Sequence, residues 1–349
     1  MVFEGKVLQH GTFPALWGPS VTAGYEELAE KRGDGAMVDK SLRLLDNSAL
    51  NEELPPQPDM TLHVPWIPED SLSLQSEWRH LGDGDFTRVY AADLKKRVDQ
   101  RTCRQRVAVK RPKQDASRII QEKFSKSVDR MSSWVHSHII KFEGIGAGYM
   151  MVMEYASQGP LDKYLRALME HGGSGMTLTE QLLAATQLIR ALEYLESRRI
   201  VHGNVSAHNT LVVRGTPDLH IKLGDPMFSI YYHSLHQNER AKLKRVRWTA
   251  PELLATNSEP TLAGDIFSYA ITLWEIMSHG AIPLASLPSE RVRDHYSHGI
   301  RLEKPPDCPD SVFRIMEQCW CHEARNRPPC RGVLRDIYTN LYGESLTGM

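Results

Sequence analysis

The clearest hydrophobic pattern in the chain runs from Thr177 to Ser197. Apolar residues recur there every three or four positions, the spacing of one face of an α-helix: Leu182, Leu183, Leu188, Ile189, Leu192 and Leu195. Thr177 and Glu180 have the spacing of a capping box, in which each side chain bonds a backbone amide at the helix start. We therefore predict a helix over 177–197 that buries its apolar face in the core.

Shorter apolar runs precede this helix and predict strands. Residues 149–155 read Tyr-Met-Met-Val-Met-Glu-Tyr, and residues 106–110 read Arg-Val-Ala-Val-Lys. Both are apolar runs of strand length. Residues 81–90 place Gly82 and Gly84 between two candidate strands. Because glycine lets the backbone approach a neighbour closely, this stretch predicts a hairpin whose turn can lie against a ligand.

The first 74 residues show no comparable pattern. Residues 54–59 and 64–68 are rich in proline, which suits neither a helix interior nor a central strand. Residues 25–50 carry a weak helical period that Gly33 and Gly35 interrupt. We expect residues 1–74 to be an N-terminal extension and linker, partly disordered, and we assign them no function.

Composition adds the class of protein. The chain has 349 residues, of which 41% are hydrophobic and 24% charged, as in an ordinary globular protein. This length allows two lobes, each with its own core. The formal net charge of −1 gives no global field that would draw the chain to nucleic acid or to a membrane surface. We therefore expect no nucleic-acid partner.

Cysteine usage and the N-terminus indicate a compartment. The five cysteines are odd in number and uneven in spacing, which favours a reducing compartment over a disulfide framework. The N-terminal residues lack the charged-then-apolar pattern of a signal peptide, and no apolar run approaches the roughly 18 residues of a membrane span. We expect a cytoplasmic location and no membrane span.

The candidate chemistry lies in two stretches after the long helix. Residues 200–209 read Ile-Val-His-Gly-Asn-Val-Ser-Ala-His-Asn, and residues 222–228 read Lys-Leu-Gly-Asp-Pro-Met-Phe. Together with the glycine turn at 81–90 and the strand ending at Lys110, they occur in the order and spacing of the protein kinases. Over residues 75–345 the chain resembles that family, which implies an α+β, bilobal fold. We expect a small β-rich N-lobe at 75–155 and a larger helical C-lobe at 156–345.

The resemblance also implies a nucleotide site. In kinases the loop after the long helix carries an aspartate that accepts the substrate proton and an asparagine that binds magnesium. Here the aspartate position is Asn204, and a carboxamide cannot act as a base near neutral pH. Asn209 and Asp225 are the implied Mg²⁺ ligands. The implied ATP contacts are Leu81, Gly82, Gly84, Thr87, Val89, Ala108, Lys110, Met153, Glu154 and Ala156.

Other positions of the kinase pattern are expected to be structural. Asp265 is implied to cap backbone amides of the loop at His202, and Arg327 to pair with Glu252. Cys319 and Cys321 point to different sides of a helix, which argues against a zinc site. His136 and His138 lack further ligands at a suitable spacing, so we expect a structural pair.

The chain departs from the kinase pattern at several positions besides Asn204. Ser127 stands where the glutamate partner of Lys110 belongs, so that ion pair is expected to be missing, with Glu122 a substitute only if the helix register shifts. Thr87 replaces the third glycine and should stiffen the turn. Pro226 holds Asp225 out of the α region, which should restrain the metal-binding loop.

A closer resemblance is to the pseudokinase domain of the Janus kinases. The shared stretches are Gly82–Thr87, Gly159–Asp162, His202–Val205, Ile221–Pro226 and Arg335–Ile337, although Gly224 and Met227 depart from the family. This resemblance implies ATP binding with little or no phosphoryl transfer. It also implies regulation of a tyrosine kinase domain, in cis or in trans, within a cytokine receptor complex that can hold the chain near the plasma membrane.

Two alternatives remain open: a weakly active tyrosine kinase that uses Lys110, Asn209 and Asp225, and a scaffold that binds no nucleotide. We expect the chain to be either a piece of a longer kinase or a free-standing relative. The basic residues at 240–247 are expected to form a solvated face, with docking of an acidic or phosphorylated partner as a hypothesis. Tyr231 and Tyr232 are possible phosphorylation sites in the same region.

Overall fold

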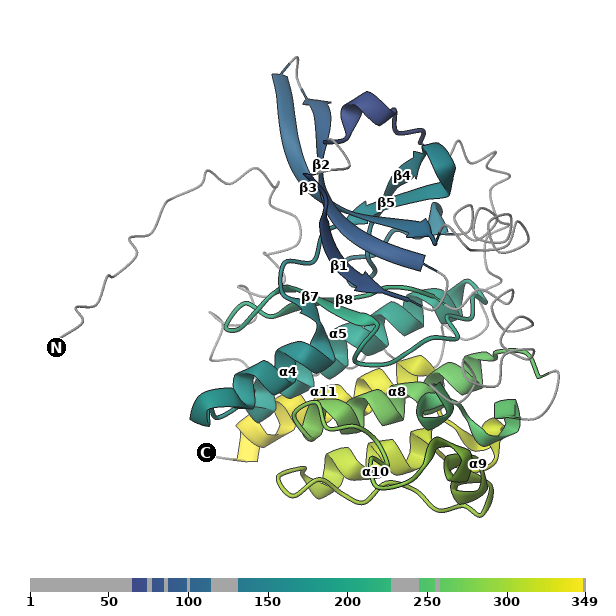
Figure 1. Cartoon of the computed structure of the whole chain (residues 1–349). Coiled ribbons are helices and arrows are strands. Elements are labelled where there is room, and N and C mark those ends of the chain that lie inside the picture. The colour runs from purple at the N-terminus through teal and green to yellow at the C-terminus, as the bar shows by residue number, and fades with distance from the viewer. Residues whose placement is uncertain are drawn as a thin grey trace, which may run out of the picture. The chain divides into compact units, whose positions relative to one another are not determined.

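The computed structural model describes residues 65–73, 77–84, 87–98, 101–113, 131–226, 245–254 and 258–347. They form a β-rich N-lobe followed by a helical C-lobe (Figure 1), which confirms the expected α+β class. Within the described residues no helix combines the length and the apolar character needed to cross a bilayer.

The N-lobe is built on one antiparallel sheet with the strand order β1-β2-β3-β5-β4. Its strands are β1 (Arg79–Asp83), β2 (Thr87–Val98), β3 (Arg101–Pro112), β4 (Phe142–Gly146) and β5 (Met150–Glu154). The predicted hairpin is β1–β2, and the predicted strands at 106–110 and 149–155 are parts of β3 and β5. β2 and β3 are twelve residues each and rise beyond the other strands (Figure 1).

Residues 65–73 pack against this sheet and are not a free linker. The amide of Ile67 donates to the carbonyl of Ile145 at 2.8 Å, and the amide of Ser73 donates to the carbonyl of Asp93 at 2.8 Å. Ile67 and Leu72 are buried with the N-lobe core residues Ala92, Leu94, Val107, Val109, Met150 and Val152. The prolines near 64–68 suggested a linker, but each end of the segment bonds a strand through non-proline amides.

The C-lobe contains six α-helices and a small sheet among the described residues. The helices are α4 (Leu161–Met169), α5 (Leu178–Ser197), α8 (Leu262–Met277), α9 (Ser289–Ser297), α10 (Asp310–Cys319) and α11 (Cys330–Thr347). The sheet has the order β6 (Gly159–Pro160), β7 (Thr210–Arg214), β8 (His220–Leu223). Short 3₁₀ turns of the C-lobe lie at Glu170–Gly172, Val246–Trp248, Pro251–Leu254 and Ala324–Asn326. The N-lobe has two such turns among its described residues, at Glu69–Ser71 and Ala147–Tyr149.

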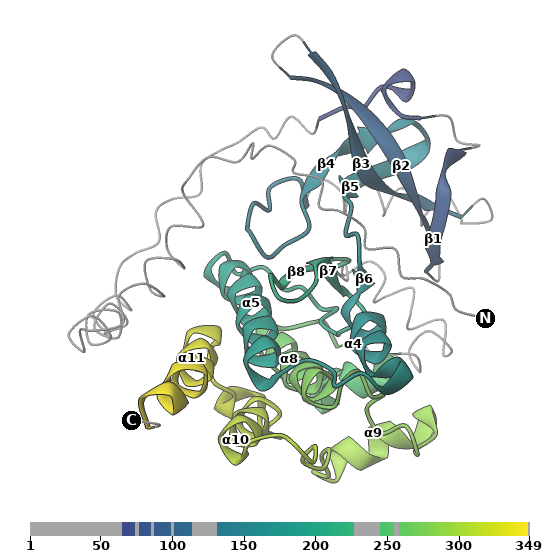
Figure 2. The same cartoon turned by 90° about the vertical axis from the view of Figure 1, so that its left-hand side faces the viewer.

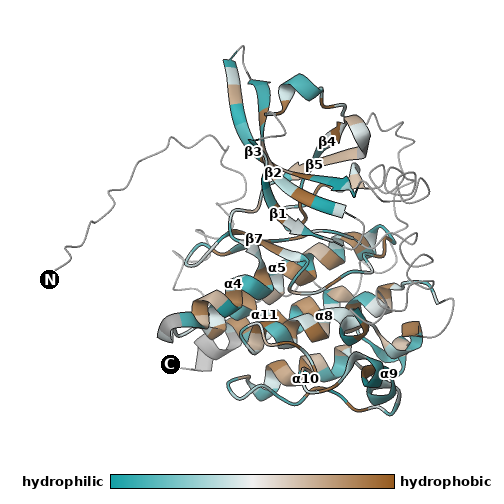
Figure 3. Ribbon diagram, in the orientation of Figure 1, coloured by the Kyte–Doolittle hydropathy of each residue, from teal (hydrophilic) through white to brown (hydrophobic). Residues whose placement is uncertain are grey.

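Helix α5 lies at the centre of the C-lobe, packed against α8 and α11 (Figure 2). The predicted capping box is present, since the Glu180 amide donates to Thr177 Oγ1 at 3.3 Å and the Thr177 amide donates to Glu180 Oε2 at 2.8 Å. The predicted apolar stripe is buried except for Leu183, which is half-buried. Figure 3 shows the hydrophobic residues along α5 and α8 that form this core.

The two lobes are joined by backbone hydrogen bonds between the segment before β4 and strand β8. The amide of Ile140 donates to the carbonyl of Leu223 at 2.9 Å, and the amide of Leu223 donates to the carbonyl of His138 at 2.8 Å. His138 and His136 lie beside this junction, and the His138 amide donates to His136 Nδ1 at 3.2 Å. Within the described parts of the chain, no cluster of side chains is suited to a metal ion around them.

Candidate functional site

The N-lobe side of the candidate nucleotide site is formed by the β1–β2 turn and the adjoining parts of β2 and β3. The turn is closed by a hydrogen bond from the Gly84 amide to the Thr87 carbonyl at 2.8 Å. A Cβ atom on Gly84 would lie 2.9 Å from Thr87 Oγ1, so the buried threonine requires glycine opposite it. Leu81 and Gly82 lie on β1, and Val89 and Ala108 lie on β2 and β3.

Lys110 projects from β3, opposite Val89 on β2 and Met151 on β5. Its ammonium group contacts the carboxylate of Asp225, a residue 115 positions later. This ion pair joins the N-lobe sheet to the loop after β8. The expected loss of the Lys110 partner at Ser127 lies outside the described residues, as does Glu122, and stays a prediction.

Asp265, near the start of α8, holds the loop that follows α5. The Asp265 carboxylate accepts hydrogen bonds from the amides of His202 and Gly203, each at 2.7 Å, which confirms the expected cap. His202 is buried, and burial lowers the pKa of its imidazole to about 3. Nδ1 of the neutral ring accepts a hydrogen bond from the backbone amide of Asn204 at 3.2 Å, which fixes the turn between these two residues.

The side chain of Asn204 links two other residues predicted for the site, Asp225 and Asn209. Its side-chain amide donates to the carbonyl oxygen of Asp225 at 2.5 Å. Its Oδ1 accepts a hydrogen bond from Asn209 Nδ2 at 2.6 Å. The structure therefore brings together four residues that the sequence placed in one site: Lys110, Asn204, Asn209 and Asp225.

The orientation of the Asn209 amide decides which of its atoms can bind a cation. Asn209 Nδ2 donates both to the carbonyl of Asn204 at 2.9 Å and to its side chain. Asn209 Oδ1 is then the atom left to act as a ligand. A carboxamide oxygen and the Asp225 carboxylate are the hard oxygen donors that Mg²⁺ prefers, and Lys110 is suited to phosphate. The donor set fits a magnesium nucleotide.

Asp225 has a backbone φ of 52°, in the left-handed region that few non-glycine residues adopt. It thus lies outside the right-handed α region, as predicted, but not in the extended region that a following proline favours. Desolvation opposes ionisation of its carboxyl, but the Lys110 ammonium, helped by Arg245, outweighs it and holds the pKa below its usual value. Asp225 is therefore anionic at neutral pH. Met227 is outside the described residues.

The predicted adenine side of the site lies at the end of β5. Met153 pairs with Ala108 on β3 and with Phe142 on β4. The Glu154 carboxylate accepts from Lys222 Nζ at 2.7 Å and from the Lys141 backbone amide at 3.1 Å, which fixes its side chain. The Ala156 carbonyl accepts from the Gly159 amide at 3.3 Å, which turns the chain toward α4.

Two basic residues at the 3₁₀ turn Val246–Trp248 are structural: Arg245, directly before it, and Arg247, within it. Arg245 Nη2 donates to the carbonyl of Gly203 at 2.9 Å. Arg247 donates to the carbonyls of Pro283, Leu284 and Leu287. The expected solvated basic face is therefore wrong for these two arginines, because the carbonyl groups of distant loops receive them. Residues 240–244, Tyr231 and Tyr232 lie outside the described residues.

A second expected structural pair is present. Arg327 donates to both carboxylate oxygens of Glu252, at 2.6 and 2.8 Å, in a two-pronged ion pair. The Arg327 side chain is only 1% exposed, so the pair links the 3₁₀ turn at Pro251–Leu254 to the chain before α11 in a buried position.

One ion pair beside the site was not predicted from the sequence. His208, directly before Asn209, lies with Nδ1 3.4 Å from Asp162 Oδ1 on α4, and Arg166 Nη2 donates to Asp162 Oδ2 at 2.6 Å. The hydrogen bond to Asp162 raises the pKa of His208. The only sequence signal was a histidine within the loop and an aspartate in the stretch Gly159–Asp162, and spacing alone does not join them.

Comparison with known proteins agrees with this geometry. Residues 76–337 match the family model of protein tyrosine and serine/threonine kinases. The chain is 29% identical over 313 residues to the tyrosine-protein kinase transforming protein ros of UR2 avian sarcoma virus, covering 87% of this chain and 76% of that protein. It is 31% identical over 264 residues to the megakaryocyte-associated tyrosine-protein kinase of Mus musculus.

It is also 30% identical over 279 residues to the high affinity nerve growth factor receptor of Gallus gallus. The chain spans 48% of the mouse kinase and 34% of the chicken receptor, so it corresponds to only part of these relatives. The matched residues include both lobes and every residue of the polar site described above. The chain belongs to the protein tyrosine and serine/threonine kinase family.

Proposed function

We propose that this chain is an ATP-binding pseudokinase domain of the Janus type. In this proposal it binds ATP with Mg²⁺ and transfers little or no phosphate. It regulates a tyrosine kinase domain, in cis or in trans, in cytoplasmic signalling from a cytokine receptor. The observation that carries the proposal is the position of Asn204, whose amide lies where a proton acceptor is needed and is engaged by Asp225 and Asn209.

The loss of phosphoryl transfer follows from the chemistry of the amide. A positioned general base contributes about 10²–10⁴-fold to a rate, and a carboxamide has no site that takes up a proton near neutral pH. Much of the catalysis of phosphoryl transfer comes from positioning and charge neutralisation, which Lys110, Asn209 and Asp225 still offer. We therefore propose a strongly reduced activity together with retained nucleotide affinity.

The regulatory role rests on the stretches shared with the Janus pseudokinase domains. Of these, His202-Gly-Asn-Val205 is the most specific, because an active kinase would lose its base with it. The sites through which a regulated kinase domain or a receptor would be contacted are not assigned to residues in this proposal.

A thermal shift measurement tests nucleotide binding. Mg²⁺-ATP at a hundredfold excess over its dissociation constant should stabilise the chain by about 2.7 kcal/mol. Lys110→Ala should abolish this shift, because Lys110 is the residue placed to reach the phosphates. Lys163→Ala, which removes an exposed lysine on α4, is the matched control and should leave the shift unchanged. A chain without any shift would be a scaffold and would overturn the proposal.

The second candidate is a weakly active tyrosine kinase. It is favoured by the ion pair of Lys110 with Asp225 and by the Asn209 oxygen left for a cation. Labelled ATP and a tyrosine-containing peptide separate the two candidates. Transfer to the peptide that Asp225→Asn abolishes would establish a kinase, whereas ATP binding without such transfer supports the pseudokinase.

A further inference from the structure

The outer part of the β2–β3 ribbon carries a group of basic residues away from the nucleotide site. Beyond the sheet, β2 and β3 continue as a two-stranded antiparallel ribbon (Figure 1). In its register Lys95 lies opposite Arg104, and Arg97 lies opposite Thr102. Side chains directly opposite each other, and those two positions apart on one strand, share a face of a ribbon. These four residues therefore form one face, which we call the cationic face.

The cationic face is distinct from the other charges of the ribbon. At its base, Arg106 is paired with Asp93 at 3.1 Å, and on the opposite face Lys96 is paired with Glu143 at 2.6 Å. Arg97 and Arg104 are exposed, and no carboxylate among the described residues pairs with either of them. Lys95 is also exposed, and its ammonium reaches only a backbone oxygen, that of Asp70, at 3.5 Å.

Placing Lys95 directly opposite Arg104 is unfavourable for the ribbon itself, because like charges in opposed positions of a ladder destabilise it. A bound anion removes this repulsion. The guanidinium fork of arginine matches the oxygens of phosphate, and the Thr102 hydroxyl adds a neutral donor on the same face. The arrangement thus fits a compact, doubly charged phosphate group.

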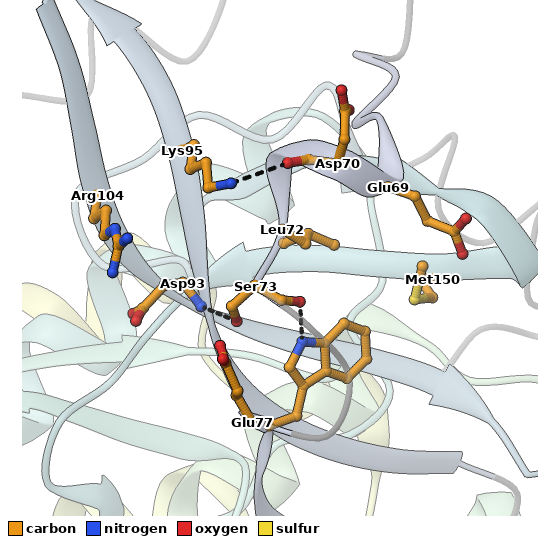
Figure 4. Close-up of a pocket in the computed structure, with 10 residues that line it drawn as sticks. Glu69, Asp70, Leu72, Ser73, Glu77, Asp93, Lys95, Arg104 and Met150 are labelled. Carbon is orange, nitrogen blue, oxygen red and sulfur yellow. Dashed lines mark hydrogen bonds between the residues drawn. The ribbon is translucent and has the colours of Figure 1, made fainter.

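Lys95 and Arg104 also line a hollow of about 450 Å³ between the ribbon and residues 69–73 and 77–78. Figure 4 shows Lys95 and Arg104 on neighbouring strands at the left, Glu69 at the right and Glu77 below them. The remaining lining is partly apolar, from Leu72, Trp78 and Met150, and partly acidic, from Asp70 and Asp93. Such a hollow suits a long aliphatic side chain that ends in a positive charge.

We propose that this surface binds a phosphorylated segment of a protein. The phosphate lies on Lys95, Arg97, Thr102 and Arg104, and a lysine or arginine near the phosphorylated residue enters the hollow. The carboxylates that line the hollow argue against a membrane or a polynucleotide, since an extended surface of negative charge would be repelled by them. A single phosphate next to a positive side chain matches both the basic residues of the cationic face and the carboxylates that line the hollow.

The test uses fluorescence anisotropy with the full chain. The probes are short labelled peptide pools with a fixed central phosphotyrosine or phosphoserine and degenerate flanking positions, each beside its unphosphorylated counterpart. We expect at least one phosphorylated pool to bind, and Arg97→Gln with Arg104→Gln to weaken it by about tenfold or more, since two charge-assisted contacts are lost. Pools that fix lysine beside the phosphorylated residue should bind more tightly than pools that fix glutamate there.

Arg101→Gln is the matched control. It removes an exposed arginine from the same ribbon, but Arg101 is one position from Thr102 and so lies on the opposite face. Binding by this variant should stay within about twofold of the unmodified chain. The thermal shift with Mg²⁺-ATP should be the same in all these variants, which separates this surface from the nucleotide site.

Three results would overturn the proposal. One is equal affinity for phosphorylated and unphosphorylated pools. Another is an equal loss of binding in the Arg101→Gln variant, which would show a general charge effect. The third is binding to vesicles that contain anionic lipid while no phosphorylated pool binds, which would assign the face to a membrane.

Discussion

The side-chain amide of Asn204 donates a hydrogen bond to the backbone carbonyl of Asp225 at 2.5 Å. The bond requires an N–H at position 204, and an aspartate there has none when it is ionised. The position of the Asp225 carbonyl therefore favours an amide over a carboxylate at residue 204.

This relationship predicts that Asn204→Asp will not restore an efficient kinase. A carboxylate would place an anionic oxygen against the Asp225 carbonyl, so the two oxygens would repel each other and the loop would shift. We expect a decrease of about 1–3 kcal/mol in the free energy of unfolding and no gain in phosphate transfer to a peptide. Denaturant unfolding and a labelled-ATP assay measure the two quantities.

Asn204→Ala is the control, because it removes the amide without adding a charge. It should be less destabilising than Asn204→Asp. If the aspartate variant were as stable as the unmodified chain and clearly more active, the loop would already be arranged for catalysis and this interpretation would be wrong.

A second prediction concerns the metal. In the proposed site Asp225 is the charged oxygen ligand of Mg²⁺, so Asp225→Asn should remove the extra stabilisation that Mg²⁺ gives to bound ATP and leave part of the shift with ATP alone. The measurement is a thermal shift with ATP in the presence and absence of Mg²⁺. Asp310→Asn, which changes an exposed carboxylate on α10, serves as the control. A Mg²⁺ effect that survives in the Asp225 variant would contradict the assignment.

A third prediction concerns the buried ion pair in the C-lobe. Glu252→Gln leaves the guanidinium of Arg327, 1% exposed, without its counter-charge. We expect a loss of about 2–3 kcal/mol, less than for a fully buried pair because the Glu252 side chain is partly open to solvent. Denaturant unfolding measures this loss. Glu323→Gln, which breaks the exposed pair with Arg325, should change the stability by about 0.5 kcal/mol or less.

A fourth prediction is a pH dependence at His208. The hydrogen bond to Asp162 raises the pKa of His208 above its ordinary 6.5. Its contribution to stability is therefore complete below pH 6.5 and is lost as the pH rises through the higher folded value. Burial opposes ionisation of Asp162, but hydrogen bonds from His208 and Arg166 outweigh it and lower that pKa to about 2. The Asp162 contribution is present above its ordinary 3.8 and falls away in acid.

The stability difference between the unmodified chain and His208→Gln should therefore be largest between about pH 4 and 6.5 and shrink above that window. NMR titration of the imidazole checks the same point, and Asp162→Asn should lower the pKa of His208. His138 is an internal control, because burial lowers its pKa to about 3 and it should not titrate between pH 5 and 8. A constant difference across the window would argue against the ion pair.

The sequence predicted those features whose partners are set by local spacing or by the family pattern. The helix of residues 178–197 follows from a capping box and an apolar stripe within one segment. The contacts of Asp265 with the His202 loop and of Arg327 with Glu252 followed from the order of the kinase stretches.

Features that depend on chain folding between distant segments were missed. Arg247 resembles a surface residue within a basic run, but its acceptors are three carbonyls about 40 positions later. His208 and Asp162 are separated by a helix and a loop. The partners of Arg247 are backbone carbonyls, which every residue has, and the partner of His208 is a single aspartate among many. No residue pattern in the sequence marks either partner.

The packing of residues 65–73 on the N-lobe sheet bears on how the protein should be expressed. A shortened chain that starts at residue 76, where the match to the kinase family model begins, would lose Ile67 and Leu72. Leu94 and Val107 would then face water, and the part of β2 that bonds Ser73 would become an open strand edge. Such edges invite pairing between molecules. A boundary chosen from the family model alone would therefore uncover this edge and favour pairing between molecules.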